Sequence, residues 1–183
     1  MHPASLPIPK LLRDVEFRTT RGPGPGGQHR NKSDTMVRLT HRPTGIHAQA
    51  GERRSLDLNR EIAVHRLRVN LALQHRRPIT ERLAAGSETT SAPAGGPALY
   101  EPSELWRSRI RGSRLVVSAR HEDFPALLAE SLDVLAWLGD DVPKAARSLG
   151  VSGSQLGRFL ALEPAALAEL NERRRRAGKH AYR

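Results

Sequence analysis

Apolar and polar residues alternate in three short stretches near the start of the chain, and this alternation is typical of half-buried β-strands. The stretches are Val15–Arg21, Thr35–His41 and Ile46–Ala50. The residues Arg42-Pro43-Thr44-Gly45 separate the second stretch from the third and favour a turn. We therefore expect the second and third strands to form a hairpin.

A longer stretch follows in which the apolar residues have the spacing of a helix. Ser55 is a suitable N-cap, and the predicted helix runs from Leu56 to about Gln74. Its apolar positions are Ile62, Ala63, Leu67, Val69, Leu71 and Leu73. The first part of the chain is thus predicted to be α+β, with a small antiparallel sheet and one long helix packed on it.

The later part of the chain is predicted to be a small helical unit. Helices are expected at Pro125–Leu138, Val142–Leu149, Ser152–Leu162 and Pro164–Arg176, after a short strand at Arg114–Ser118. The second and third of these helices, separated by a glycine turn, have the rhythm of a helix-turn-helix. The same rhythm occurs in ordinary helical bundles.

The composition changes between these two parts. The stretch Glu88–Pro102 is rich in Ser, Thr, Ala, Gly and Pro and has no apolar period, so it is predicted to be a linker. We expect three regions: an α+β domain at 1–86, a linker at 87–103, and a helical domain with a basic tail at 104–183.

The charge of the chain favours a polyanionic partner. Lys and Arg number 30 against 19 Asp and Glu, which gives a formal charge of +11, and 26 of the 30 cations are Arg. Residues 1–86 carry 16 basic and 7 acidic side chains, a net charge of +9. Arginine is suited to phosphate oxygens and to stacking on bases. No amphipathic basic helix stands out, so RNA or DNA is favoured over a membrane.

Other features of the sequence narrow the class of protein. No run of about 18 apolar residues is present that would predict a transmembrane helix, and residues 1–10 lack the features of a secretory signal. The chain has no cysteine and 8 histidines that lack the spacing of metal ligands. We expect a cytoplasmic protein with no metal site and no bound cofactor.

The segment Gly22–Gln28 (GPGPGGQ) can be neither helix nor strand. Prolines stiffen it, while Gly26 and Gly27 let the backbone approach a ligand closely. The first polar side chain after the glycines is Gln28, whose amide can orient a water and whose main-chain N–H can stabilise an oxyanion. A cluster able to contact phosphate and sugar follows: His29, Arg30, Asn31 and Lys32.

The stretches Gly24–Ile46 and Glu52–Leu67 resemble the catalytic domain of class I peptide chain release factors. They are similar also to the codon-independent rescue peptidyl-tRNA hydrolases that share this domain. The resemblance covers roughly Asp14 to Gln74. It rests on the Gly-Gly-Gln-His tip, Asn31-Lys32, the strand VRLTH, the turn Pro43-Thr44-Gly45, and the helix start Arg54-Ser55 with Asn59.

The resemblance implies hydrolysis of the ester of peptidyl-tRNA, with the ribosomal RNA of the peptidyl transferase centre as the surrounding partner. Gly26 and Gly27 would give the tip its backbone geometry, and Gln28 would be catalytic. Positioning and charge stabilisation can suffice for this step, so His29 is not needed as a base. The resemblance also implies a possible Gln28 N-methyltransferase as a partner.

Two residues depart from the pattern of the family. Arg30 stands where the family usually has a small apolar residue, and Leu56 stands where Gln commonly follows Arg-Ser. Neither residue bears on the proposed chemistry, but both concern docking to the ribosome.

Codon-independent rescue is favoured over stop-codon reading. Only 25 residues precede Gly26, and no codon-reading tripeptide is recognisable in the second part. The basic end of the chain could contact RNA through Arg173, Arg174, Arg175, Arg176 and Lys179. A solvated helix end favoured by the helix dipole explains the same residues.

Two alternatives stay open. The chain could be a ribosome- or RNA-binding protein that kept the fold without catalysis, for which Arg30 and Leu56 are the best support. It could instead be a DNA-binding regulator that uses the segment Ala145–Leu160, although acidic residues Asp140 and Asp141 lie beside that segment.

Overall fold

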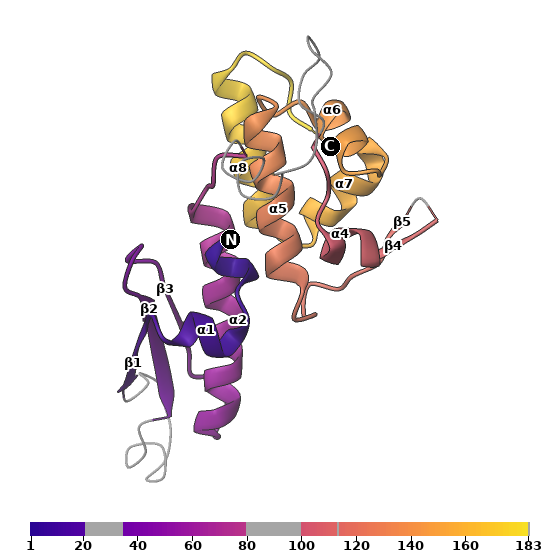
Figure 1. Ribbon diagram of the computed structural model, residues 1–183. Coiled ribbons are helices and arrows are strands. Elements are labelled where there is room, and N and C mark those ends of the chain that lie inside the picture. The colour runs from indigo at the N-terminus through magenta and orange to yellow at the C-terminus, as the bar shows by residue number, and fades with distance from the viewer. Residues whose placement is uncertain (21–34, 80–99, 113, 183) are drawn as a thin grey trace.

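The computed structural model describes residues 1–20, 35–79, 100–112 and 114–182. Its first part is α+β, as predicted (Figure 1). Three antiparallel strands, β1 (Val15–Thr20), β2 (Met36–His41) and β3 (His47–Ala50), form a sheet in the order β1-β2-β3. Each strand is predicted to within one residue at either end.

The turn between β2 and β3 follows from its sequence. Gly45 has a φ of +71°, a conformation that glycine adopts without strain. The Gly45 N–H donates to the carbonyl of His41 at 2.8 Å, and the His41 ring shares a hydrogen bond of 2.8 Å with the Thr44 hydroxyl. Burial of the His41 ring lowers its pKa.

The long helix α2 (Leu56–Gln74) has the predicted bounds, and the Ser55 hydroxyl accepts a hydrogen bond from the Leu58 N–H as an N-cap. One side of α2 lies on β2 and β3, where four small or branched side chains are almost fully buried. These side chains are Val37, Leu39, Ala48 and Ala50.

Two short elements precede the sheet, the 3-10 turn η1 (Pro3–Ser5) and helix α1 (Ile8–Leu12). The first of these packs against both α2 and a helix of the second part. Neither element is evident from the apolar pattern, because each is only one turn long.

The second part is helical, as predicted. It contains α5 (Phe124–Trp137), α6 (Val142–Ser148), α7 (Gly153–Ala161) and α8 (Pro164–Arg176). Before them lie α4 (Glu104–Ser108) and a small hairpin of β4 (Ile110–Arg111) with β5 (Arg114–Leu115). The strand predicted at 114–118 is therefore shorter than expected. No described helix is long and apolar enough to cross a membrane.

Helix α5 packs against both parts of the chain. All of its residues from Phe124 to Leu135 are buried, and α5 packs along the C-terminal half of α2 (Figure 1). One hydrophobic cluster consequently extends from Ala4 through the sheet and α2 to Leu170 in α8. The division into 1–86, 87–103 and 104–183 stays a prediction, and most of the expected linker lies outside the described residues.

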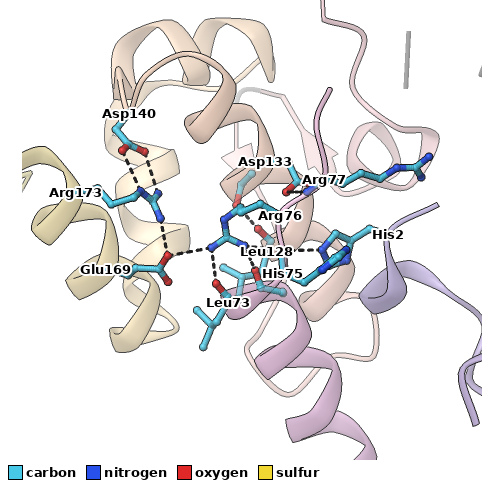
Figure 2. A network of polar contacts seen from close by, with 12 residues as sticks. His2, Leu73, His75, Arg76, Arg77, Leu128, Asp133, Asp140, Glu169 and Arg173 are labelled. Carbon is cyan, nitrogen blue, oxygen red and sulfur yellow. Dashed lines mark hydrogen bonds and ion pairs between the residues drawn. The ribbon is translucent and has the colours of Figure 1, made fainter. Parts of the chain in front are cut away.

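A chain of alternating charges also joins the two parts (Figure 2). Arg76, just after α2, donates to the carbonyl of Leu73 at 2.6 Å and lies 3.4 Å from Glu169 of α8. Glu169 pairs with Arg173 at 2.6 Å, and Arg173 pairs with Asp140 after α5. Because cations and carboxylates alternate in this row of four side chains, each of them lies next to a side chain of opposite charge.

The imidazole of His2, near the N-terminus, lies beside His75 at the end of α2, next to Arg76 (Figure 2). Its Nδ1 accepts a hydrogen bond from the Ala4 N–H at 3.0 Å, so the neutral ring carries its proton on Nε2, which donates to the His75 carbonyl at 3.1 Å. The ring is only 7% exposed, and burial lowers its pKa from 6.5 to about 4.

This buried histidine makes stability depend on pH. The folded state favours neutral His2, so its contribution is complete above pH 6.5, the ordinary pKa, and is lost as the pH falls toward about 4. The loss should reach about 3 kcal/mol. Urea unfolding of the wild type and of His2→Gln between pH 7 and pH 4 measures it. Parallel pH profiles of the two proteins would contradict the expectation.

Candidate nucleic-acid interface

The predicted catalytic residues Gly26, Gly27 and Gln28 lie outside the described residues. The predicted RNA contacts His29, Arg30, Asn31 and Lys32 lie there too. What the structure describes is the part of the domain to which the segment 21–34 is attached. The candidate site is therefore built from the residues on either side of that segment and from those packed against them.

The flanking residues belong to paired strands. Thr20, the last residue of β1, is the register partner of Met36, the first residue of β2. The segment 21–34 thus starts and ends at the same end of the sheet. The N-terminus of α2 lies at this end as well (Figure 1), and the helix dipole gives it a partial positive charge.

The buried side chain of Asn59 ties these segments together. Its Nδ2 donates to the Thr35 carbonyl at 2.6 Å and to the Arg53 carbonyl at 2.8 Å, while its Oδ1 accepts from the Arg53 N–H at 2.9 Å. Asn59 is 0% exposed, so its side-chain amide is shielded from water and depends on these three bonds. One amide therefore fixes the residue before β2 to the residues before α2.

The role of Asn59 was missed by the sequence interpretation, which used this residue only as part of a family motif. A signal was available. Asn59 is a polar residue one turn before Ala63, on the side of α2 that is buried. A buried amide must find partners, and here the partners are the ends of two loops.

Exposed arginines surround the same end of the sheet. Arg53 and Arg54 precede α2, and Arg60 lies in its second turn. The Arg60 guanidinium carbon lies 5.7 Å from the centre of the Phe17 ring on β1, a cation–π geometry. Arg18 on β1 is 69% exposed and pairs with Glu16. This end of the domain is suited to a phosphate backbone.

The predicted basic cluster at the C-terminal end of the chain divides into two groups. The first group encloses the turn after α5: Arg173 makes a two-pronged ion pair with the Asp140 carboxylate, Arg174 donates to the Asp140 carbonyl, and Lys179 donates to the Gly139 carbonyl at 2.6 Å. These cations stabilise the C-terminal end of a helix, where the dipole favours positive charge.

The second group is Arg175 and Arg176, whose side chains are 67% and 76% exposed. Within the part of the chain that the structure describes, both pair only with Glu172 on the same helix, and exposed pairs of this kind contribute about 0 to 1 kcal/mol. An RNA phosphate could replace that carboxylate at little cost. RNA binding by the whole cluster stays a prediction, and these two residues are the best placed for it.

The helix-turn-helix-like segment is covered on one face by the chain itself. A Cβ on Gly157 of α7 would lie 2.5 Å from the Cε1 of Tyr182, so the ring lies directly on the helix. The backbone of Tyr182 is held by Asn171 of α8 through two hydrogen bonds of 2.7 and 3.0 Å. The face of α7 with Gly153 and Gly157 is therefore closed to an outside partner.

A groove of about 560 Å³ lies along β3 and α2. Here Asn70 donates to the His47 carbonyl at 2.8 Å and Arg66 donates to the Gln49 carbonyl at 2.9 Å. These two side chains occupy the outward carbonyls of the edge strand, so β3 is protected from pairing with another strand. No group of three or more His, Asp or Glu that could hold a metal ion occurs within the described residues.

Comparison with known proteins shows that the first part of the chain is similar in sequence to release factors. Residues 8–95 match the model of the RF-1 domain. Peptide chain release factor 2 of Acidovorax sp. (strain JS42) is 53% identical over 58 residues, which are 32% of this chain and 16% of that protein. The mitochondrial peptide chain release factor 1-like protein of Mus musculus is 43% identical over 78 residues, which are 39% of this chain and 21% of that protein. The match thus spans about a fifth or less of these relatives.

Proposed function

Because residues 8–95 of this chain match the RF-1 domain of peptide chain release factors, we propose that the protein hydrolyses the ester bond of peptidyl-tRNA on the ribosome, without reading a stop codon. The match of this segment is the observation that carries the proposal. The arrangement around Asn59 supports it, because the segment with the Gly-Gly-Gln tripeptide is attached at an end of the sheet that also presents exposed arginines.

In this proposal Gln28 is the catalytic residue. Its main-chain N–H stabilises the oxyanion that develops on the ester carbonyl, and its side chain positions the attacking water. Gly26 and Gly27 allow the backbone to enter a cavity with RNA walls. The partners are ribosomal RNA of the peptidyl transferase centre and peptidyl-tRNA in the cytoplasm, with a methyltransferase acting on Gln28 as a further proposed partner.

Two features of the second part of the chain are the basis for proposing codon independence. Its described surface carries exposed Arg175 and Arg176 at the end of α8, and its sequence has no recognisable codon-reading tripeptide. These arginines would contact the mRNA channel when it is empty. The alternative of a binding protein without catalysis differs from this proposal in one measurable way, the release of peptide.

The test measures peptide release from purified ribosomes that carry formyl-methionyl-tRNA, with an empty decoding site, a sense codon or a stop codon. We expect the wild type to release peptide from ribosomes with an empty site and to gain nothing from a stop codon. Dependence on a stop codon would contradict codon independence, and ribosome binding without release would favour the inactive alternative.

The arginine pair is tested in the same assay with Arg175→Gln/Arg176→Gln. The double variant should need about tenfold more protein for half-maximal release, because loss of two phosphate contacts weakens binding and reduces its salt dependence. The control is Arg111→Gln/Arg114→Gln, which removes two exposed cations of the β4–β5 hairpin. Equal effects of the two double variants would show that net charge alone matters.

A further inference from the structure

The inner face of β1 is left uncovered by α2. The register pairs Phe17 of β1 with Leu39 of β2, so both side chains lie on the face of the sheet that α2 packs against. Leu39 is 1% exposed, whereas Phe17 is 44% exposed. The difference arises because α2 packs on β2 and β3, and β1 lies beyond the edge of the helix (Figure 1).

Arg60 is the side chain from α2 that reaches across to Phe17, with its guanidinium 5.7 Å from the ring centre. Arg60 is exposed, and among the described residues it has no hydrogen-bond or ion-pair partner. The ring holds the guanidinium in place, but nothing in the described chain neutralises its charge. A planar cation and an aromatic ring are thus presented together to solvent.

Leu56 extends this surface. It lies one turn before Arg60, at the i,i+4 spacing that puts two side chains on the same face of a helix, and it is 38% exposed. Leu56 is also one of the two residues that depart from the family pattern, in which Gln is common at this position. Exposed apolar carbon therefore adjoins the guanidinium on α2. We call Phe17, Arg60 and Leu56 the stacking platform.

We propose that the stacking platform binds an unpaired RNA base, which lies against the Phe17 ring and the Arg60 guanidinium while Leu56 contacts its edge. Unpaired bases are recognised in this way by aromatic rings and by the planes of arginine side chains. The choice of RNA rests on the proposed function, and charge supports it. Exposed Arg53 and Arg54 lie at the same end of α2 and can hold the adjoining phosphates.

An apolar peptide is a poorer occupant for the same reasons. A peptide segment would bury the unpartnered charge of Arg60 without a carboxylate, which is costly. A base leaves the guanidinium stacked and partly hydrated, and its phosphates supply the opposite charge. The base would lie beside the strand that leads into the segment 21–34, so the platform would help to orient that segment on ribosomal RNA.

The experiment uses the full chain and a short single-stranded RNA that contains one 2-aminopurine, whose fluorescence falls when it stacks. A matched RNA has an abasic site at that position and keeps every phosphate. We expect the wild type to quench the fluorescence and to bind the intact RNA about tenfold more tightly than the abasic RNA. Phe17→Leu keeps an apolar side chain, and Arg60→Lys keeps the charge; each should bind both RNAs with nearly equal affinity.

A third variant, Leu56→Gln, restores the residue that the family commonly has and should retain quenching with weaker binding. Arg114→Lys, far from the platform, is the control and should behave as the wild type. Thermal unfolding of each variant shows that the fold is kept. Equal binding of the two RNAs by the wild type, unchanged preference in Phe17→Leu, or no RNA binding at all would overturn the proposal.

These outcomes are separate from those of the release assay. Peptide release by a wild type that shows no preference for the intact RNA would remove the platform and leave the proposed function standing. If the wild type prefers the intact RNA but releases no peptide, the stacking platform is supported and the proposed function is contradicted.

Discussion

Replacement of Gln28 by alanine is expected to lower peptide release from ribosomes with an empty decoding site by about a hundredfold, with ribosome binding unchanged. The substitution keeps the main-chain N–H and removes only the amide that positions water. Misplacement of a reacting group has effects of about this size. Single-turnover release at saturating protein isolates the chemical step from binding.

Gln28→Pro tests the second proposed role of this residue, in which its main-chain N–H stabilises the oxyanion, because proline has no N–H. Loss of an oxyanion donor costs a further factor of about 10² to 10³. His29→Ala is the matched neighbour and should change the single-turnover rate far less, since the proposed step needs no side-chain base. Release by Gln28→Ala at the wild-type rate would exclude Gln28 as the catalytic residue.

Replacement of Asn59 by leucine is expected to destabilise the protein by about 4 kcal/mol. The variant removes three hydrogen bonds inside the protein and leaves the Thr35 carbonyl and both backbone groups of Arg53 without that partner. A buried polar group left unsatisfied costs about 1 to 3 kcal/mol. Urea unfolding followed by circular dichroism measures the change.

Asn70→Leu is a matched control on the same helix. Asn70 is half-buried and donates one hydrogen bond, to the His47 carbonyl at 2.8 Å, so its loss should cost about 1 kcal/mol. A destabilisation by Asn59→Leu no larger than that of Asn70→Leu would show that the Asn59 bonds are not coupled to the fold.

The Asn59 variant should also lose release activity under conditions in which it stays folded. Asn59 holds the residue before β2, and hence one end of the segment that carries the predicted catalytic residues. Activity that falls by about tenfold in folded protein would reflect this positioning. Asn70 does not bond to Thr35, so Asn70→Leu leaves that link intact and should keep its activity.

The sequence by itself determined the three strands of the sheet, the long helix and the four helices after residue 123, in their order. Alternation of apolar residues predicted β1, β2 and β3, and the Pro-Thr-Gly turn predicted the hairpin, because a strand with one buried face must alternate. Ser55 and the helical spacing after it placed α2 from Leu56 to Gln74. The family resemblance also came from local residues and was confirmed by the match of residues 8–95.

Tertiary structure alone decided which polar side chains face one another. Glu169 and Arg173 have the i,i+4 spacing of neighbours on one helix. Arg76 lies far from both in the chain, and no spacing rule joins it to them, yet the three form one line of alternating charge. The basic run at the end of α8 likewise contains both structural cations and exposed ones, because the turn after α5 happens to lie beside Arg173.

The surface beside Phe17 was decided in the same way. The alternation of apolar residues predicted that Phe17 and Leu39 would each be half-buried in a strand. Only the position of α2 over β2 and β3 leaves the Phe17 ring exposed and the Leu39 side chain buried. Local patterns fix which side of a strand a residue faces. What covers that side depends on packing between elements distant in sequence, which no local pattern encodes.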